Sequence, residues 1–217
     1  MTNQMSKSSA KMTELLRRAP MLPLVVLDDP NDAVPLAEAL LSAGLPVIEV
    51  ALRTPAALRA IEAIARDIPE ATIGAGTVTS RAALRAAASA GASFVVSPGA
   101  TSELLAAGLG SSTPLLPGVA TPSDVIRALE FGYGTLKFFP AAAAGGTAML
   151  KALHGPFPDV SFCPTGGINA ANASDYLALP NVVTVGGSWV APDNLVKQRA
   201  WAEVRSLAAD AVAKLAA

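Results

Sequence analysis

The sequence is short of several residue types, and each shortage narrows the class of protein. Cysteine occurs once, at Cys163, which excludes an intrachain disulfide and a cysteine-rich metal site. Histidine also occurs once, at His154, and no motif combines His, Asp and Glu at metal-ligand spacing, so no metal is expected. No apolar run reaches the roughly 18–20 residues that cross a bilayer, so we expect no membrane segment. A reducing cytoplasm is the expected location.

Charge is also scarce, because charged residues make up 15% of the chain and the formal net charge is −1. Such a chain lacks the basic character that attracts nucleic acid or an anionic membrane, so neither is an expected partner. The hydrophobic fraction of 52% in 217 residues supplies one large core. The low charge suggests that a partner, such as another copy of the chain, covers part of the surface.

Short apolar runs alternate with alanine- and leucine-rich stretches that are typical of helices. We expect strands over residues 22–27, 46–52, 71–75, 93–96, 115–116, 136–139, 161–163 and 182–185. Strands this apolar belong to a parallel sheet covered by helices. Eight such units predict an α/β fold, a single-domain (β/α)8 TIM barrel over residues 13–217, after a flexible segment of residues 1–12. An open doubly wound sheet is less favoured, because no Gly-x-Gly-x-x-Gly motif follows the first strand.

Lys137 is the most unusual residue, because it lies in an apolar strand between Leu136 and Phe138. Loss of hydration there favours the neutral amine, which can attack a carbonyl carbon and form an imine. A lysine that pairs with a carboxylate, or that extends to the rim of the barrel, explains the same pattern. The residues alone favour neither reading.

Glu49 is its natural complement, because it also lies in an apolar strand, where an unpaired carboxylate is unfavourable. It either forms a structural ion pair with Lys137 or transfers protons during imine formation and carbon–carbon cleavage. Arg53 follows four residues later and is suited to hold a substrate carboxylate, although a surface ion pair is the commoner role for such a residue.

Two glycine pairs follow the last two predicted strands, where barrel enzymes commonly bind phosphate. The N–H groups of Gly166, Gly167 and Gly187 can approach an oxyanion closely, and Ser188 offers a hydroxyl. The alternative is that these glycines only permit tight turns.

Several stretches of the chain resemble the 2-keto-3-deoxy-6-phosphogluconate (KDPG) aldolases, which are class I aldolases of the Entner–Doudoroff pathway. These stretches are EVALRT (49–54), GAGTV (74–78), LKFFPA (136–141), FCPTGGI (162–168) and VGGSW (185–189). The resemblance implies that Lys137 forms the imine with substrate and that Glu49 transfers protons. It also implies a homotrimer without a metal or organic cofactor.

The resemblance also implies roles for the residues around this pair. Arg53 and Thr77 would hold the pyruvyl carboxylate, Pro98 and Phe139 would line the pocket, Thr165 would contact the substrate, and Gly166, Gly167, Gly187 and Ser188 would bind the phosphate. The chain departs from the family in its acidic pair Asp28-Asp29, where a more basic segment is usual. It also departs in the alanine-rich residues 141–146.

The implied reaction is cleavage of KDPG to pyruvate and glyceraldehyde 3-phosphate, with a side activity on 4-hydroxy-2-oxoglutarate. Sister aldolases for 4-hydroxy-2-oxoglutarate or 2-keto-3-deoxy-6-phosphogalactonate would share the lysine chemistry. A sugar-phosphate isomerase or epimerase, and a phosphosugar-binding barrel without activity, are further alternatives. Both would leave the lysine free of any covalent adduct.

Overall fold

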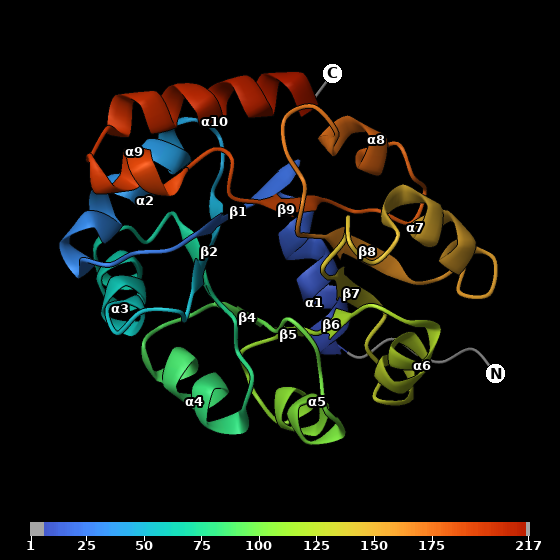
Figure 1. Ribbon diagram of the computed structural model, residues 1–217. Helices are drawn as coiled ribbons and strands as arrows, with labels where there is room; N and C mark the ends of the chain where they lie inside the picture. The colour runs from blue at the N-terminus through green and yellow to red at the C-terminus, as the bar shows by residue number, and fades with distance from the viewer. Residues whose placement is uncertain (1–6, 216–217) are drawn as a thin grey trace.

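The computed structural model describes residues 7–215, in which a curled parallel sheet is surrounded by helices (Figure 1). The strands are β1 (Met21–Val25), β2 (Val47–Ala51), β3 (Thr72–Gly76), β4 (Phe94–Val96), β5 (Leu115–Leu116), β6 (Gly118–Val119), β7 (Thr135–Phe138), β8 (Ser161–Pro164) and β9 (Val185–Gly187). The helices are α1 (Lys7–Leu16), η1 (Pro30–Asp32), α2 (Ala33–Ser42), α3 (Ala57–Asp67), α4 (Arg81–Ser89), α5 (Ser102–Leu109), α6 (Pro122–Glu130), α7 (Gly146–His154), α8 (Ala173–Leu177), α9 (Asp193–Lys197) and α10 (Trp201–Leu215). The predicted α/β class and parallel pairing are therefore confirmed.

The strands form a six-stranded sheet in the order β5-β4-β3-β2-β1-β9 and a three-stranded sheet in the order β6-β7-β8. The two sheets meet at Pro117, which separates β5 from β6 and has no N–H to donate to a ladder. At the other side, isolated bridges join Thr165 to Gly186 and Phe162 to Val182. The fifth expected strand, at residues 115–116, thus continues past Pro117 as β6.

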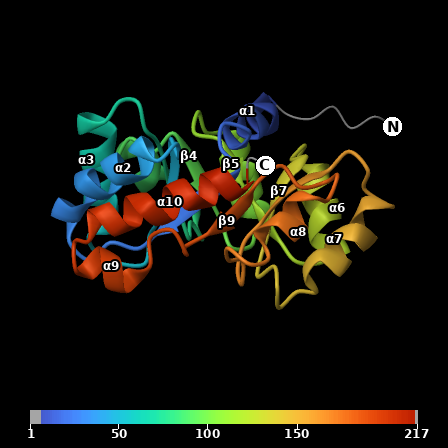
Figure 2. The same cartoon turned by 90° about the horizontal axis from the view of Figure 1, so that it is seen from above.

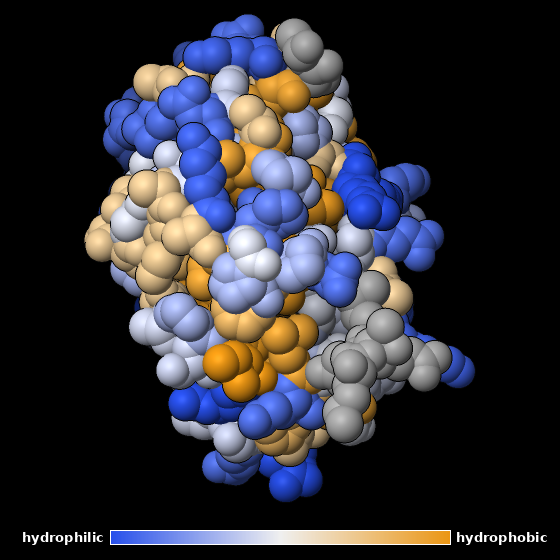
Figure 3. Space-filling model, turned by 90° about the vertical axis from the view of Figure 1, so that its right-hand side faces the viewer, coloured by the Kyte–Doolittle hydropathy of each residue, from blue (hydrophilic) through white to orange (hydrophobic). Residues whose placement is uncertain are grey.

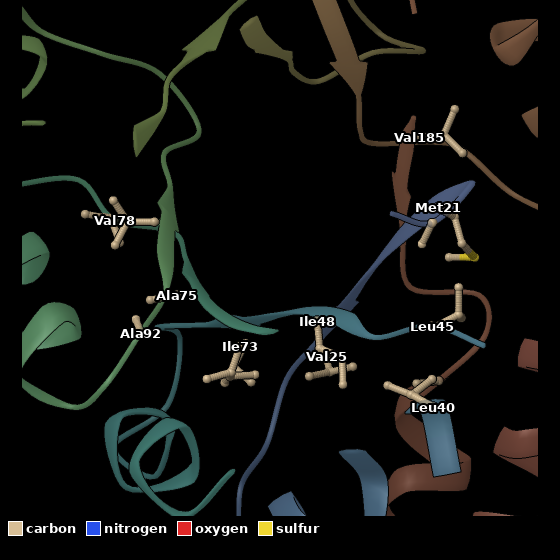
Figure 4. Close-up of a cluster of buried hydrophobic side chains, with 14 of the residues drawn as sticks. Met21, Val25, Leu40, Leu45, Ile48, Ile73, Ala75, Val78, Ala92 and Val185 are labelled. Carbon is tan, nitrogen blue, oxygen red and sulfur yellow. The ribbon is translucent and has the colours of Figure 1, made fainter. Parts of the chain in front are cut away.

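Alternation along the strands divides the apolar residues into two clusters. The larger cluster fills the layer between the sheet and the helices, and Figure 4 shows part of it, including Val25, Ile48 and Ile73 from the strands and Leu40 from α2. The smaller cluster lies inside the curled sheet, where Val47 and Phe94 are fully or almost fully buried. Glu49 and Lys137 occupy inward positions of β2 and β7, so the fold directs both charges into this interior.

Helix α1 lies at the N-terminal end of the strands, beyond one end of the curled sheet (Figure 2). Met12, Leu15 and Leu16 pack into the inner cluster, and the Ser9 hydroxyl accepts hydrogen bonds from the N–H groups of Gly134 and Thr135 at 2.9 and 3.1 Å. We expected a flexible segment over residues 1–12, but residues 7–12 belong to this helix; residues 1–6 lie outside the described part of the chain. The reason is the apolar stripe, whose spacing matches one helical face.

Within residues 7–215, no helix is both long enough and apolar enough to span a membrane. Figure 3 shows the side of the molecule that lies on the right in Figure 1. On this side, hydrophilic residues are interspersed with small apolar patches. Among the large hydrophobic residues of this described range, Ile126 on α6 is the most exposed, at 50% of its surface.

Candidate active site

Lys137 and Glu49 meet inside the curled sheet. The Lys137 Nζ donates a hydrogen bond to Glu49 Oε1 at 3.2 Å, and the two residues are 4% and 1% exposed. The ammonium also lies 5.5 Å from the centre of the Phe139 ring, within the range of a cation–π contact. Two opposite charges held out of water at this distance form a pair whose attraction is much stronger than at the surface.

The second oxygen of Glu49 has no partner among the described residues. Glu49 Oε2 is buried without a hydrogen bond, which is rare for a carboxylate oxygen and leaves it available to a bound molecule. Gly76 of β3 makes room for this side chain, because a Cβ at Gly76 would overlap Glu49 Oε1. The strand next to Glu49 therefore shapes the position of its carboxylate.

Cys163 forms part of the apolar floor beside the pair. Its backbone is the register partner of Lys137 in the β7–β8 ladder, and its side chain is fully buried in the inner cluster. Burial raises the pKa of the Cys163 thiol to about 12, while the charge of Lys137 lowers it and that of Glu49 raises it. The thiol is therefore protonated at neutral pH and is not a nucleophile of the site.

Arg53 and Thr77 lie together at the C-terminal ends of β2 and β3. Arg53 Nε donates to Thr77 Oγ1 at 3.1 Å. No carboxylate in the described part of the chain pairs with this guanidinium, so its terminal nitrogens remain available for a ligand. Thr77 has a φ of +60°, a left-handed conformation that costs a non-glycine residue about 1–2 kcal/mol. Such strain is common at functional sites.

Pro98 and Thr165 are both packed against inward-facing glycines. A Cβ at Gly118 would overlap the Pro98 carbonyl group, and one at Gly186 would overlap Thr165 Oγ1. Sequence reasoning missed Gly76, Gly118 and Gly186 as parts of the site. The signal was present, because each is a glycine at an inward position of a strand, where a close approach is the usual reason for glycine.

The two glycine segments lie next to each other, since Thr165 bridges to Gly186. Gly166 and Gly167 adopt φ values of +99° and +75°, which favour glycine. Gly187 differs from the expectation of an open approach, because the Trp189 ring lies directly against its Cα. The Ser188 side chain is exposed.

The acidic pair Asp28 and Asp29 forms ion pairs with Lys197 at the end of α9 and with Arg199 just after it. Asp28 lies 3.7 Å from Lys197, and Asp29 lies 3.0 Å from Arg199, which also contacts Asp32 at 2.7 Å. These residues surround a cavity of about 380 Å³. The negative charge of this acidic pair, by which the sequence departs from the family, is thus balanced by Lys197 and Arg199.

Within residues 7–215, no group of three or more His, Cys, Asp and Glu side chains is placed to hold a metal ion. The described site is instead a lysine–glutamate pair with an arginine at its rim and a glycine turn nearby. This arrangement suits attack of an amine on a carbonyl group of an anionic substrate.

The chain is similar to known proteins over most of its length. Residues 12–207 match the aldolase family described as KDPG and KHG aldolase. The chain belongs to this family. It is 50% identical over 200 residues to a 2-dehydro-3-deoxy-phosphogluconate aldolase of Pseudoalteromonas atlantica, covering 92% of this chain and 93% of the relative. It is 44% identical to the KHG/KDPG aldolase of Escherichia coli K12, covering 95% and 96%.

Solved structures of the KDPG aldolases agree in fold. The KDPG aldolase of Legionella pneumophila, with pyruvate captured as a covalent carbinolamine, has a TM-score of 0.91 and 48% identity, covering 92% of this chain and 97% of that one. The enzyme of Zymomonas mobilis ZM4 with 3-phosphoglycerate has a TM-score of 0.88 and 43% identity, covering 94% and 96%. The family resemblance seen in the sequence is therefore confirmed.

Proposed function

We propose that this protein is a class I aldolase, a carbon–carbon lyase that cleaves KDPG to pyruvate and glyceraldehyde 3-phosphate. The observation that carries the proposal is the buried Lys137–Glu49 pair, at 3.2 Å, in a chain of this family. A side activity on 4-hydroxy-2-oxoglutarate is in keeping with relatives named KHG/KDPG aldolase.

In the proposed reaction the buried Lys137 ammonium first passes a proton to the Glu49 carboxylate, and the neutral Nζ then attacks the C2 carbonyl of the substrate. A proton reaches the carbonyl oxygen and one leaves the nitrogen, which gives a carbinolamine. Glu49 returns its proton to the carbinolamine hydroxyl, water departs, and a protonated imine remains. Glu49 lies within hydrogen-bond reach of Nζ, so its carboxylate is placed to carry these protons. Its unpartnered Oε2 supports this role.

The protonated imine then accepts the electrons of the breaking bond. A base removes the proton of the C4 hydroxyl, the C3–C4 bond breaks, and its electron pair moves into the imine to form an enamine. The C4 oxygen becomes the aldehyde oxygen of glyceraldehyde 3-phosphate, which leaves the site. The enamine takes a proton at C3, and water hydrolyses the resulting imine to pyruvate and free Lys137.

The remaining residues bind the two ends of the substrate. Arg53 offers its terminal guanidinium nitrogens to the pyruvyl carboxylate beside Thr77, and a bidentate contact there would fix the keto acid. Phe139 and Pro98 line the pocket, and Thr165 contacts the substrate. The turn of Gly166 and Gly167, with Gly187 and Ser188, receives the phosphate.

Finer features of the molecule follow the same family expectation. We propose that β5 and β6 act as one strand, so that the sheet closes into a single-domain (β/α)8 barrel to which helix α1 also belongs; the bridge between Thr165 and Gly186 supports closure. A protected exchange pattern for amides on both sides of Pro117 would agree with this, and rapid exchange throughout β6 would contradict it.

We further propose a homotrimer that acts in the cytoplasm without a metal or organic cofactor. Apolar side chains on the surface, such as Ile126 at 50% exposure, support association. Light scattering at working concentration should give three times the mass of the chain, and a monomer mass would contradict it. Full activity after treatment with a chelator and dialysis is expected.

A coupled assay tests the proposed reaction. Pyruvate released from KDPG is followed through the NADH consumed by lactate dehydrogenase, and the C4 epimer 2-keto-3-deoxy-6-phosphogalactonate is assayed beside it. We expect a higher kcat/KM for KDPG. A higher value for the epimer would assign the protein to the sister reaction, and no pyruvate from either substrate would reject the aldolase.

A further inference from the structure

The turn between β8 and α8 presents three successive backbone N–H groups. Within residues 7–215, those of Gly166, Gly167 and Ile168 make no hydrogen bond. Successive free N–H groups in a turn form a concave site for an anion. In the proposed function, this turn binds the phosphate of the substrate. The contacts that hold the turn in its conformation therefore also determine how the phosphate binds.

Each of these N–H groups shares a peptide group with the carbonyl of the preceding residue. All three carbonyl oxygens accept a hydrogen bond that holds the peptide group in place. The loop after β7 holds two of them: Ala141 N–H donates to Thr165 O at 2.8 Å, and Ala142 N–H donates to Gly166 O at 3.0 Å. In a trans peptide the C=O and N–H groups point in opposite directions. A donor that fixes one carbonyl therefore also fixes the N–H of the next residue.

The third peptide group is held by a side chain. Asn172 Nδ2 donates to Gly167 O at 3.0 Å, which fixes the direction of the Ile168 N–H. Asn172 Oδ1 accepts from Asn169 N–H at 2.9 Å, so both ends of the carboxamide are engaged and its orientation is set. Of the three donors, Asn172 is the one that a substitution can remove without a change to the backbone.

We propose that Asn172 is a positioning residue of the phosphate site. It holds the Gly167–Ile168 peptide so that the Ile168 N–H binds the substrate phosphate together with those of Gly166 and Gly167. The proposal rests on the proposed function for the identity of the anion. Asn172 acts through the peptide and does not itself touch the substrate, so it should affect the binding of phosphate more than the chemistry at Lys137.

Two substitutions distinguish the contributions of the two hydrogen bonds that the Asn172 carboxamide makes. Asn172→Ala removes both hydrogen bonds, whereas Asn172→Asp keeps an acceptor for Asn169 N–H and loses the donor to Gly167 O. Asn169 supplies matched controls, because its Oδ1 accepts from Ala171 N–H at 2.8 Å and does not reach Gly167. Asn169→Ala controls for a lost loop contact, and Asn169→Asp controls for an added negative charge.

The readout is the ratio of kcat/KM for KDPG to kcat/KM for unphosphorylated 4-hydroxy-2-oxoglutarate. We expect this ratio to fall about five- to tenfold in Asn172→Ala, through a higher KM for KDPG, as the loss of one hydrogen bond predicts. In Asn172→Asp the ratio should fall at least as far as in Asn172→Ala, and further than it does in Asn169→Asp. Asn169→Ala should stay within about twofold of the wild type.

Titration with inorganic phosphate, followed by calorimetry, tests the site without catalysis. The Kd should rise about five- to tenfold in Asn172→Ala. An unchanged ratio and Kd in that variant would overturn the proposal, as would a wild type that binds no phosphate. Equal losses on both substrates, or normal binding by Asn172→Asp, would leave Asn172 with a purely structural role and overturn it as well. A missing pyruvate adduct on Lys137 would instead reject the proposed function, and the phosphate titration would still decide the role of Asn172.

Discussion

At the scale of single residues, the proposed reaction rests on the buried Lys137–Glu49 pair. Each charge lowers the free-energy cost of burying the other, because a buried charge without a partner is strongly destabilising. Within the described residues Glu49 Oε2 makes no hydrogen bond, although it is buried. In the proposed reaction this oxygen is the acceptor that the pair offers to the substrate.

Glu49→Gln tests the proton-transfer role. Glutamine keeps the shape of the side chain but cannot exchange a proton with the substrate, so we expect kcat to fall about 10²- to 10⁴-fold. Steady-state assays on KDPG would measure this, with circular dichroism to check the fold. Glu62→Gln, on the exposed face of α3, is the matched control and should keep full activity. A kcat for Glu49→Gln within threefold of the wild type would exclude Glu49 as the proton carrier.

Single residues were predictable from the sequence where they contradicted their surroundings. Lys137 and Glu49 are charges in apolar strands, and the structure brings them together as the sequence suggested. Gly76 and Asn172 do not contradict their surroundings: Gly76 showed only that something approaches its strand closely, and Asn172 gave no signal. Their importance comes from partners distant in space, the Glu49 carboxylate and the Gly167 carbonyl, and a glycine or an asparagine near a strand end is common for other reasons.

At the scale of elements, helix α6 shows how local sequence determines where a helix begins. Thr121 and Asp124 form a capping box, in which Thr121 Oγ1 accepts from Asp124 N–H and the Asp124 carboxylate accepts from Thr121 N–H at 3.0 Å. The segment Thr121-Pro122-Ser123-Asp124 carries the sequence pattern of such a cap, with proline at the first helical position. Capping depends on residues three positions apart, which explains why it can be read without knowledge of the fold.

The cap gives stability a defined pH dependence. Partial burial acts to raise the pKa of Asp124, but hydrogen bonds from Thr121 and Ala120 and the charge of Arg127 outweigh it and hold the pKa below its usual value. A carboxyl whose pKa is lower in the folded protein stabilises it above the unfolded pKa near 3.8 and loses that effect as pH falls further. We expect Asp124→Asn to lower the free energy of unfolding by about 0.5–1 kcal/mol at pH 7.

Urea unfolding at pH 7 and at about pH 3 measures this effect, with the difference between wild type and Asp124→Asn expected to shrink at the lower pH. Asp175→Asn, on the exposed part of α8, serves as a comparison. A difference of the same size at both pH values would show that the ionised carboxylate is not what stabilises the cap.

At the scale of the whole molecule, helix α1 covers one end of the curled sheet and completes the inner cluster. Met12 is fully buried there beside Leu15 and Leu16. The alternation of strands and helices was predictable, because it depends on periodicity along the chain. The position of α1 was not, since its short apolar stripe carries no information about which cavity it fills. The continuation of the sheet past Pro117 as β6 was also missed, because residues 115–116 alone suggested a complete short strand.

Met12→Ala measures the contribution of this helix. Removing a buried methionine side chain should lower the free energy of unfolding by about 2–5 kcal/mol, through lost apolar burial and the cavity that remains. Chemical denaturation provides the value. The neighbouring substitution Lys11→Ala, on the exposed face of α1, should change it by less than about 0.5 kcal/mol. Equal values for the two variants would mean that α1 does not belong to the core.

The covalent step at Lys137 is the central claim, and reductive trapping tests it most directly. The protein is incubated with pyruvate and sodium borohydride, digested, and analysed by mass spectrometry, with Lys137→Ala as the control. We predict a stable adduct of pyruvate on the peptide that contains Lys137, loss of activity in step with its formation, and no adduct in the control. Full activity after this treatment, with no mass increase on Lys137, would contradict the account.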